Sequence, residues 1–527
     1  MGAACVLLSA ASIAFLVGTV RAEAPVARIG FLSDTHVSGD SVSCAKLAKA
    51  YDYFRGAHVD VIVNCGDIAD RFLPEAYRNY ADVRRRTYPE STGAPCEIFV
   101  YAGHDAIGFP SVGRQGETNA FAAVRSCLGI NHAPWDRFEI AGFTFLVFPQ
   151  FGKEEYGRYE RAIAAACAAS SGKPVFVVEH VPGAFTTQAS NFWGDEKRRS
   201  ILSHYPQVVA ITGHAHGSMY DERNLWQGDY TSVNVAGMTH YRPDAVGVSN
   251  TSRTSGSVIY ADLYADRIVF RRRDIVNDCD CGDPWTLLFA NRESMTFDRR
   301  FTAKNAPVFA EDAALGVDCS GKDLACVVNF PAAKGAVRVY RMSFARKVAG
   351  GWQTFSVRDE MADYDVPSAR RKAHWTITVP HALFDGEDEV GVRVEPLGFG
   401  SFAGLPLSTT FVARARKLES AVEVRECRKV GQDILLVAPG FSKLSGMVSL
   451  VLELSVEQPS DRAANLRLTS GKFRLFDKML TPAGNSTLRY AFDVSLPRQG
   501  LADELRLTVA GCAHVTVQST RIVQVGD

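Results

Sequence analysis

Acidic and histidine side chains recur in five short motifs across the first half of the chain. The motifs are Asp34-Thr35-His36, Gly66-Asp67-Ile68-Ala69-Asp70, Gly103-His104-Asp105, Glu179-His180-Val181-Pro182 and Gly213-His214-Ala215-His216-Gly217. A carboxylate can bridge two cations, and imidazole nitrogen suits zinc, iron and similar metals. A single Asp-x-His is weak evidence, because an ordinary turn after a strand often has this composition. The ordered series of five motifs predicts a two-metal site assembled from separate parts of the chain.

Each motif directly follows an apolar run that is typical of a buried strand. These runs cover residues 26–33, 59–65, 97–102, 174–179 and 208–212. Between the first two, Cys44, Leu47, Ala48, Tyr51 and Phe54 fall on one face at helical spacing. This alternation predicts a layered α/β domain, and open α/β folds bind ligands at the carboxyl ends of their strands. Residues 137–148 and 257–271 read as hairpins, so part of the sheet system should be antiparallel.

In order and spacing, the five motifs resemble the calcineurin-like metallophosphoesterases over about the first half of the chain. The resemblance implies a four-layer domain with two central β-sheets flanked by helices. It also implies one metal ion held by Asp34, His36, Asp67 and His216, and a second held by Asp67, His180 and His214. Purple acid phosphatases resemble the pattern too, but they carry Tyr where Asp70 stands and lack the histidine at position 36.

The same resemblance gives His104 and Asp105 catalytic roles. His104 would protonate or stabilise the leaving oxygen, and Asp105 would fix the orientation of that histidine. Two divalent ions, Mn, Fe or Zn, would activate hydroxide for in-line attack on phosphorus. The implied activity is hydrolysis of phosphomonoesters or phosphodiesters, in a small molecule or a cell-surface polymer.

Position 103 departs from the family pattern. The third motif of the family usually has Asn here, as a ligand of the second metal, whereas this chain has Gly103. Water, the substrate phosphate or an unrecognised side chain could replace the missing oxygen. A mononuclear centre or an exchangeable second site are the alternatives.

The charge balance and the length of the chain predict a local active site in a multi-domain protein. The 58 basic residues balance the 58 acidic ones, so no global basic field indicates a nucleic-acid partner. At 527 residues the chain exceeds one ordinary core. We predict a metallophosphoesterase domain over 26–276, a linker over 277–299, and two all-β, sandwich-like domains over 300–413 (fibronectin- or immunoglobulin-like) and 416–527.

The amino terminus predicts export. Residues 2–20 form an apolar run without charge, and Ala22 ends a small-residue cleavage pattern, which together read as a signal peptide over 1–22. A retained membrane anchor is the alternative; without it no stable membrane span remains. The expected location is secreted or periplasmic.

Cys319 and Cys326 suit a local disulfide in an oxidising compartment, and buried thiols are the alternative for the other cysteines.

The sequence allows an alternative function and suggests two residues that could contact the substrate. A catalytically impaired metal-binding or surface-adhesion protein, acting through its β domains, is the alternative to an enzyme. Phe192 and Trp193, in a polar stretch after His180, are candidates for a substrate wall, although core packing explains most aromatic residues equally well.

Overall fold

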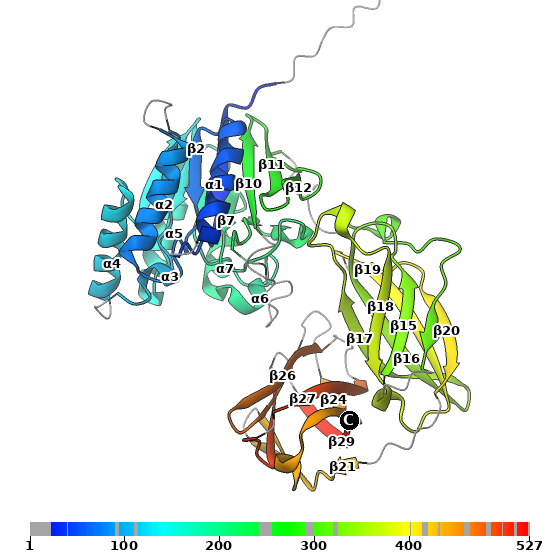
Figure 1. The fold of residues 1–527 in the computed structure, drawn as a ribbon. Coiled ribbons are helices and arrows are strands. Elements are labelled where there is room, and N and C mark those ends of the chain that lie inside the picture. Colours follow the sequence, from blue (N-terminus) through cyan, green and yellow to red (C-terminus); the bar gives the residue numbers. More distant parts are fainter. Residues whose placement is uncertain are drawn as a thin grey trace, which may run out of the picture.

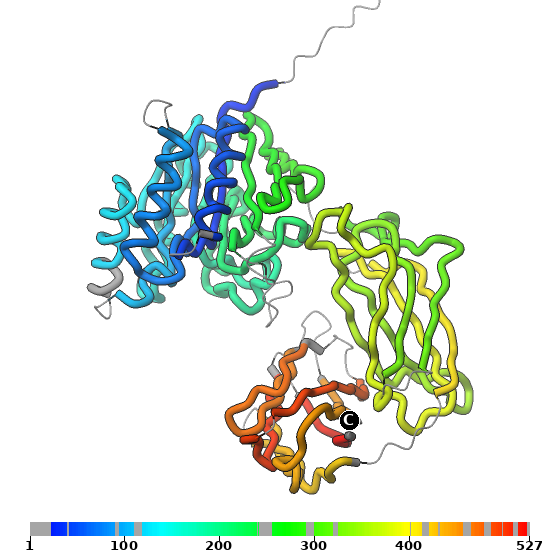
Figure 2. Tube along the Cα trace, in the orientation of Figure 1, coloured from blue at the N-terminus to red at the C-terminus, as the bar shows by residue number. Residues whose placement is uncertain are grey.

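The computed structural model describes residues 23–38, 41–89, 94–109, 114–239, 241, 256–290, 300–319, 325–400, 402–413, 420–430, 433–457, 464–480, 486–497, 499–510 and 514–524. An α/β domain comes first and two all-β domains follow it (Figures 1 and 2). The predicted signal peptide, 1–22, and the predicted boundary between the two β domains, after residue 413, lie outside these residues.

The first sheet of the α/β domain combines parallel and antiparallel strands. Its parallel part consists of β1 (Ala27–Leu32), β2 (Val61–Asn64) and β3 (Cys96–Phe99). β1 also pairs antiparallel with β10 (Ser257–Leu263), which forms a hairpin with β11 (Arg267–Asp274). The predicted hairpin over 257–271 is therefore confirmed.

The second sheet has the order β4-β5-β6-β7-β9-β8. Its strands are β4 (Asp136–Ile140), β5 (Phe143–Val147), β6 (Val175–Val178), β7 (Val208–Thr212), β8 (Leu225–Gln227) and β9 (Thr231–Asn234). β4 and β5 form the other predicted hairpin, with its turn at Ala141 and Gly142. β5, β6, β7 and β9 run parallel to their neighbours, so their carboxyl ends share one edge.

The two sheets pack face to face between two layers of helices. Phe31 and Val63 of the first sheet share one buried core with Phe145 and Val178 of the second. The outer face of the first sheet packs on α1 (Ser41–Gly56), α2 (Pro74–Thr87) and α4 (Arg114–Leu128), and that of the second on α5 (Tyr156–Ala169) and α7 (Glu196–Leu202). This is the predicted four-layer arrangement, visible in Figure 1. The apolar stripe of α1 is buried as its spacing predicted, with Leu47, Tyr51 and Phe54 fully covered.

The first part of the segment predicted as a linker contains two short strands. β12 (Cys279–Asp280) and β13 (Trp285–Leu288) both pair with β11 and extend the first sheet. Trp285 is buried, and its indole N–H donates to Glu222 Oε2 at 2.8 Å. The polar, turn-rich composition concealed these short strands, because two apolar side chains in β13, Trp285 and Leu287, provide nearly all its burial.

Each all-β domain consists of two facing sheets. The first contains β14-β15-β18 and β17-β16-β19-β20, and the second contains β21-β29-β24-β27 and β22-β23-β28-β25-β26. The bounds in the first are β14 (Gly316–Asp318), β15 (Ala325–Pro331), β16 (Val337–Val348), β17 (Gly351–Met361), β18 (His374–Pro380), β19 (Glu389–Gly398) and β20 (Leu407–Val412). In the second they are β21 (Ser420–Val422), β22 (Glu426–Val430), β23 (Asp433–Val437), β24 (Gly446–Glu457), β25 (Ala464–Ser470), β26 (Phe473–Leu480), β27 (Ser486–Leu496), β28 (Glu504–Ala510) and β29 (His514–Gln524).

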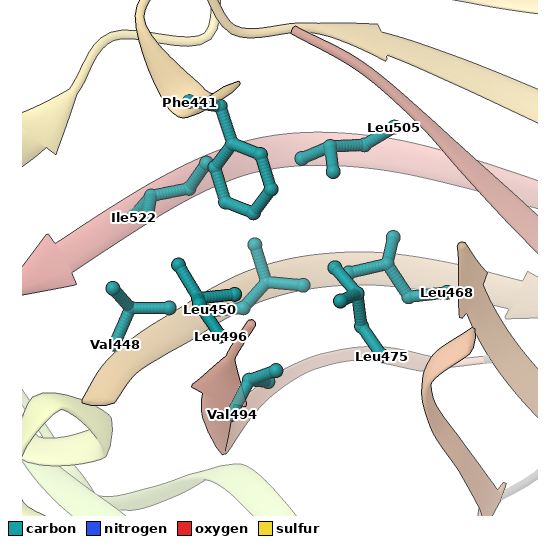
Figure 3. Close-up of a pocket in the computed structure, with 9 residues that line it drawn as sticks. All are labelled: Phe441, Val448, Leu450, Leu468, Leu475, Val494, Leu496, Leu505 and Ile522. Carbon is teal, nitrogen blue, oxygen red and sulfur yellow. The ribbon is translucent and has the colours of Figure 1, made fainter. Parts of the chain in front are cut away.

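Apolar side chains from both sheets meet inside the last domain. Figure 3 shows nine of them around a small gap: Phe441, Val448, Leu450, Leu468, Leu475, Val494, Leu496, Leu505 and Ile522. All of them except Phe441 lie on strands of the two sheets, with their side chains on the inner faces. The gap has no polar lining residue, so it reads as imperfect packing of a core.

The first β domain contacts the α/β domain through charged and polar groups. Arg300 donates to Glu222 Oε2 at 3.1 Å and to the Leu225 carbonyl at 2.7 Å, and Tyr364 Oη donates to Asp221 Oδ2 at 3.2 Å. The predicted Cys319–Cys326 disulfide is present. Among the helices of the described residues, none has the length and apolar character needed to cross a membrane.

Candidate metal centre and active site

The loops that follow the strands of both sheets bring six predicted metal ligands together. Asp34 and His36 follow β1, Asp67 follows β2, His180 follows β6, and His214 and His216 follow β7. Main-chain hydrogen bonds lock neighbouring loops together, since the His36 N–H donates to the Asp67 carbonyl at 3.0 Å. Residues far apart in sequence therefore converge at one rim, as strand-end positions predicted.

Most of these ligand candidates have an unusual backbone conformation. Asp34, His36, Asp67, His214 and His216 all have positive φ, between 38° and 69°. Such angles are uncommon for residues with a side chain and persist only where the surroundings impose them. These sharp turns direct the side chains towards the rim. The residues with a strained backbone are therefore themselves proposed metal ligands.

Asp34, His36 and His216 form the first cluster. His216 Nε2 lies 3.2 Å from Asp34 Oδ1, and the Nε2 atoms of His36 and His216 lie 3.4 Å apart. All the ligand atoms of this cluster lie within 4.8 Å of one another. Asp34 Oδ2 accepts the His214 N–H at 3.0 Å, which fixes the carboxylate and links this cluster to the next.

Asp67, His180 and His214 form the second cluster within the same distance limit. His180 is fully buried and its Nε2 lies 3.0 Å from Asp67 Oδ2. Asp67 Oδ2 also lies 3.9 Å from His36 Nε2. Asp67 thus stands between the two clusters, the position that a bridging carboxylate requires.

Burial and mutual charge shift the pKa values of these groups in opposite directions. Burial raises the pKa of Asp34 to about 6 and lowers that of His36 to about 4. Burial would also raise the pKa of Asp67, but the neighbouring His180 outweighs it and holds that pKa well below its usual range. The pKa of His180 rises to about 9, because the attraction of Asp67 exceeds the effect of burial. The shifts show that burial favours the neutral forms of Asp34 and His36, whereas Asp67 and His180 stabilise each other's charged forms.

The residues present fit divalent metal ions. Asp34 Oδ1 is buried without a hydrogen-bond partner among the described residues, although a buried carboxylate oxygen without a partner is costly. Four imidazole nitrogens and two carboxylates make a mixed N/O donor set, which suits Mn, Fe or Zn. Asp34, His36 and His216 would hold one ion, Asp67, His180 and His214 the other, with Asp67 placed to reach both.

His104 lies beside the first cluster, but its orienting partner differs from the prediction. Its Nδ1–H donates to the Asp70 carbonyl oxygen at 2.8 Å, and its ring meets the His36 ring edge-on at 4.8 Å. The Asp70 carboxylate lies 3.5 Å from His36 Nδ1. Asp70 therefore contacts both histidines. The sequence identified Asp70 as part of a motif but predicted no role for it.

Asp105 faces away from the His104 ring and into the protein. Its Oδ1 accepts the N–H groups of Ile68 and Ala69 and the Tyr77 hydroxyl, and its Oδ2 accepts the Ala102 N–H. The prediction that Asp105 orients His104 as a catalytic residue is not what the structure shows. Asp105 instead holds the loop after β2 against the loop after β3.

Trp193 borders the second cluster, and Phe192 precedes it in the same short helix. Phe192 and Trp193, in α6 (Ser190–Trp193), are 38% and 37% exposed. The Trp193 ring lies edge-on to His214, with centroids 5.8 Å apart. The exposure of both side chains, with Trp193 beside a metal-ligand candidate, supports a substrate wall over core packing.

A four-layer α/β fold whose rim carries two His/Asp clusters defines a metal-dependent hydrolase domain. Residues 27–218 match the model of the calcineurin-like phosphoesterase family. The α/β domain is accordingly a calcineurin-like phosphoesterase domain, which supports a hydrolase that acts on phosphoric ester bonds. No curated protein is significantly similar to the chain.

Solved structures with a similar arrangement include two phosphatases. A dimetal phosphatase from Danio rerio is 14% identical, with a TM-score of 0.36, over 50% of this chain and 99% of its own. A purple acid phosphatase from yellow lupin (Lupinus luteus) seeds is 13% identical, with a TM-score of 0.36, over 50% of this chain and 53% of its own. The assignment rests on the family match and the site geometry.

Proposed function

We propose that the chain is an exported phosphoesterase that uses two divalent ions, Mn, Fe or Zn, to hydrolyse phosphomonoesters or phosphodiesters. The observation that carries the proposal is the convergence of the two three-residue clusters with Asp67 between them. When bound, the ions would polarise the phosphoester and activate water for attack.

His104 supplies a proton-transfer group in this proposal. Because its Nδ1–H donates to the Asp70 carbonyl, the Nε2 atom is the one that can gain and release a proton. The side chain is 41% exposed, so a substrate oxygen can reach it. His104 would donate this proton to the leaving oxygen or stabilise its charge. Asp70 is the positioning residue for this histidine.

The experiment is a substrate comparison with purified protein that has been stripped of metal and reloaded with Mn²⁺. 4-Nitrophenyl phosphate and bis(4-nitrophenyl) phosphate separate monoesterase from diesterase activity. Aryl esters are suitable first substrates because Trp193 lies beside the second cluster. Asp67→Asn should abolish turnover of both, since the bridging carboxylate is lost. Asp266→Asn is the matched control, because Asp266 is exposed in the β10–β11 turn. Equal rates in wild type and Asp67→Asn would contradict the proposal.

Export is the second part of the proposal. The Cys319–Cys326 disulfide supports an oxidising compartment, and the apolar run over 2–20 supports a cleaved signal. The amino-terminal sequence of protein recovered from the extracytoplasmic fraction tests it. We expect the mature chain to begin near Glu23; full-length protein confined to the cytoplasm would contradict export.

A further inference from the structure

Gly103 stands where the loop after β3 approaches two of the three ligands of the second cluster, His180 and Asp67. On one side of it, Ala102 packs near Gly66 and His180: a Cβ on Gly66 would lie 2.7 Å from Ala102 Cβ and 2.9 Å from His180 Nδ1. On the other side, the His104 N–H donates to Asp67 Oδ1 at 3.1 Å. A side chain at position 103 would therefore begin next to the second cluster, and glycine provides none.

The space beside Gly103 is taken by the carboxamide of Gln150. A Cβ on Gly103 would lie 3.1 Å from Gln150 Oε1 and 3.4 Å from its Nε2. The Gly103 N–H donates to Oε1 at 2.8 Å, and the Gln150 N–H donates to the Tyr101 carbonyl at 2.8 Å. Gln150 follows β5 in the second sheet, so its main chain and side chain both anchor it to the loop after β3. This contact brings an amide oxygen from the opposite sheet to position 103.

An amide oxygen can add a fourth donor to the three of the second cluster. Asp67, His180 and His214 offer three side-chain donors to an ion that ordinarily takes four or more. A carboxamide oxygen has two lone pairs, of which the Gly103 N–H uses one. The second lone pair of Oε1 remains able to coordinate a cation.

We propose that Gln150 supplies the amide oxygen ligand of the second metal ion, in place of the side chain that Gly103 lacks. The inference rests on the two-metal site of the proposed function. Glycine and glutamine act as a pair, because a larger residue at position 103 would crowd Gln150 at 3.1 Å. An asparagine is sterically acceptable there only when the glutamine side chain moves or is removed.

A double-mutant cycle on metal binding tests this pairing without depending on turnover. Wild type, Gln150→Ala, Gly103→Asn and the double variant are stripped of metal and titrated with Mn²⁺ by calorimetry, with electron paramagnetic resonance to detect the coupled Mn pair. Gln150→Ala should weaken the second site by roughly 10- to 100-fold and leave the first site unchanged. The double variant should restore most of that affinity, since the asparagine introduced at position 103 then has both the oxygen and the space. Gln353→Ala, in β17 of the first β domain, is the matched control.

The outcomes separate this inference from the proposed function. Gln150 is exposed and its side chain accepts one exposed hydrogen bond, so its truncation should lower the melting temperature of the metal-free protein only slightly. If Gln150→Ala binds both ions as wild type does while Asp67→Asn loses them, the role of Gln150 is overturned and the metal centre stands. If Asp67→Asn also binds both ions as wild type does, the metal centre itself is wrong. A double variant that binds no better than Gln150→Ala would show that Gln150 does not stand in for a residue at 103.

Discussion

His180 Nε2 lies 3.0 Å from Asp67 Oδ2, while His180 Nδ1–H donates to the Cys65 carbonyl at 2.8 Å. This second bond fixes the tautomer, so the Nε2 of the neutral ring directs a lone pair at a carboxylate. Two such acceptors repel each other unless a proton or a metal ion lies between them. In the metal-free protein the proton takes this place, which is why the pKa of His180 rises to about 9.

Metal affinity should therefore depend on pH in a defined direction. Metal binds neutral imidazole, so below the His180 pKa of about 9 binding must displace a proton. The apparent affinity for Mn²⁺ should rise by up to tenfold per pH unit from pH 7 towards pH 9, and then level off. Calorimetry in buffers of different ionisation enthalpy should count about one proton released with the second ion. An affinity independent of pH over this range would show that His180 is not displaced.

Loss of the His104 imidazole should slow chemistry without removing metal. We expect His104→Ala to lower kcat by about 10²- to 10⁴-fold on phenyl phosphate, because the leaving phenolate needs a proton. The loss should be smaller on 4-nitrophenyl phosphate, whose leaving group is a weaker base. Metal content measured by atomic emission should stay at the wild-type value. Equal losses on both esters would argue against proton transfer by this residue.

Asp105 should contribute to stability through its four hydrogen bonds. In Asp105→Asn, either the amide faces the Ala102 N–H, or it faces the N–H groups of Ile68 and Ala69. At least one buried donor then loses its acceptor, at a cost of about 1–3 kcal/mol. Urea unfolding of the metal-free protein measures this free energy. An unchanged midpoint would mean that the loop after β2 does not depend on this carboxylate.

The β13 strand should belong to the folded α/β domain. A chain that ends at Asn277 lacks Trp285, which is 2% exposed and packs under the Arg272 guanidinium at 4.3 Å. Removing a buried tryptophan costs about 3–5 kcal/mol, so this chain should melt well below one that ends at residue 290. Differential scanning calorimetry compares the two. Equal melting temperatures would restore the view that the segment is a linker.

The sequence predicted the parts of the site that local pattern encodes. Apolar runs marked β1, β2, β6 and β7, and the turns after them carried Asp34, Asp67, His180 and His214 in recognisable motifs. Parallel strands then place these turns at a common edge, so convergence followed from the fold class.

The contacts that sequence reasoning missed depend on tertiary packing. Gln150 lies in no motif, and only the pairing of the loop after β5 with the loop after β3 brings it to Gly103. The role of Asp105 was misassigned because adjacency in sequence to His104 does not determine which way a side chain points. Asp105 is third in the one-turn helix α3 (Gly103–Ala106), whose geometry turns it inward.

The rate of ester hydrolysis as Mn²⁺ is added to the metal-free chain shows whether the two clusters form one catalytic metal centre. We predict no turnover without metal, and a rise in rate that continues beyond the first equivalent and saturates with two ions bound per chain. This behaviour follows from two ligand clusters that share Asp67. Full turnover of the metal-free protein, unchanged by added Mn²⁺, would contradict it.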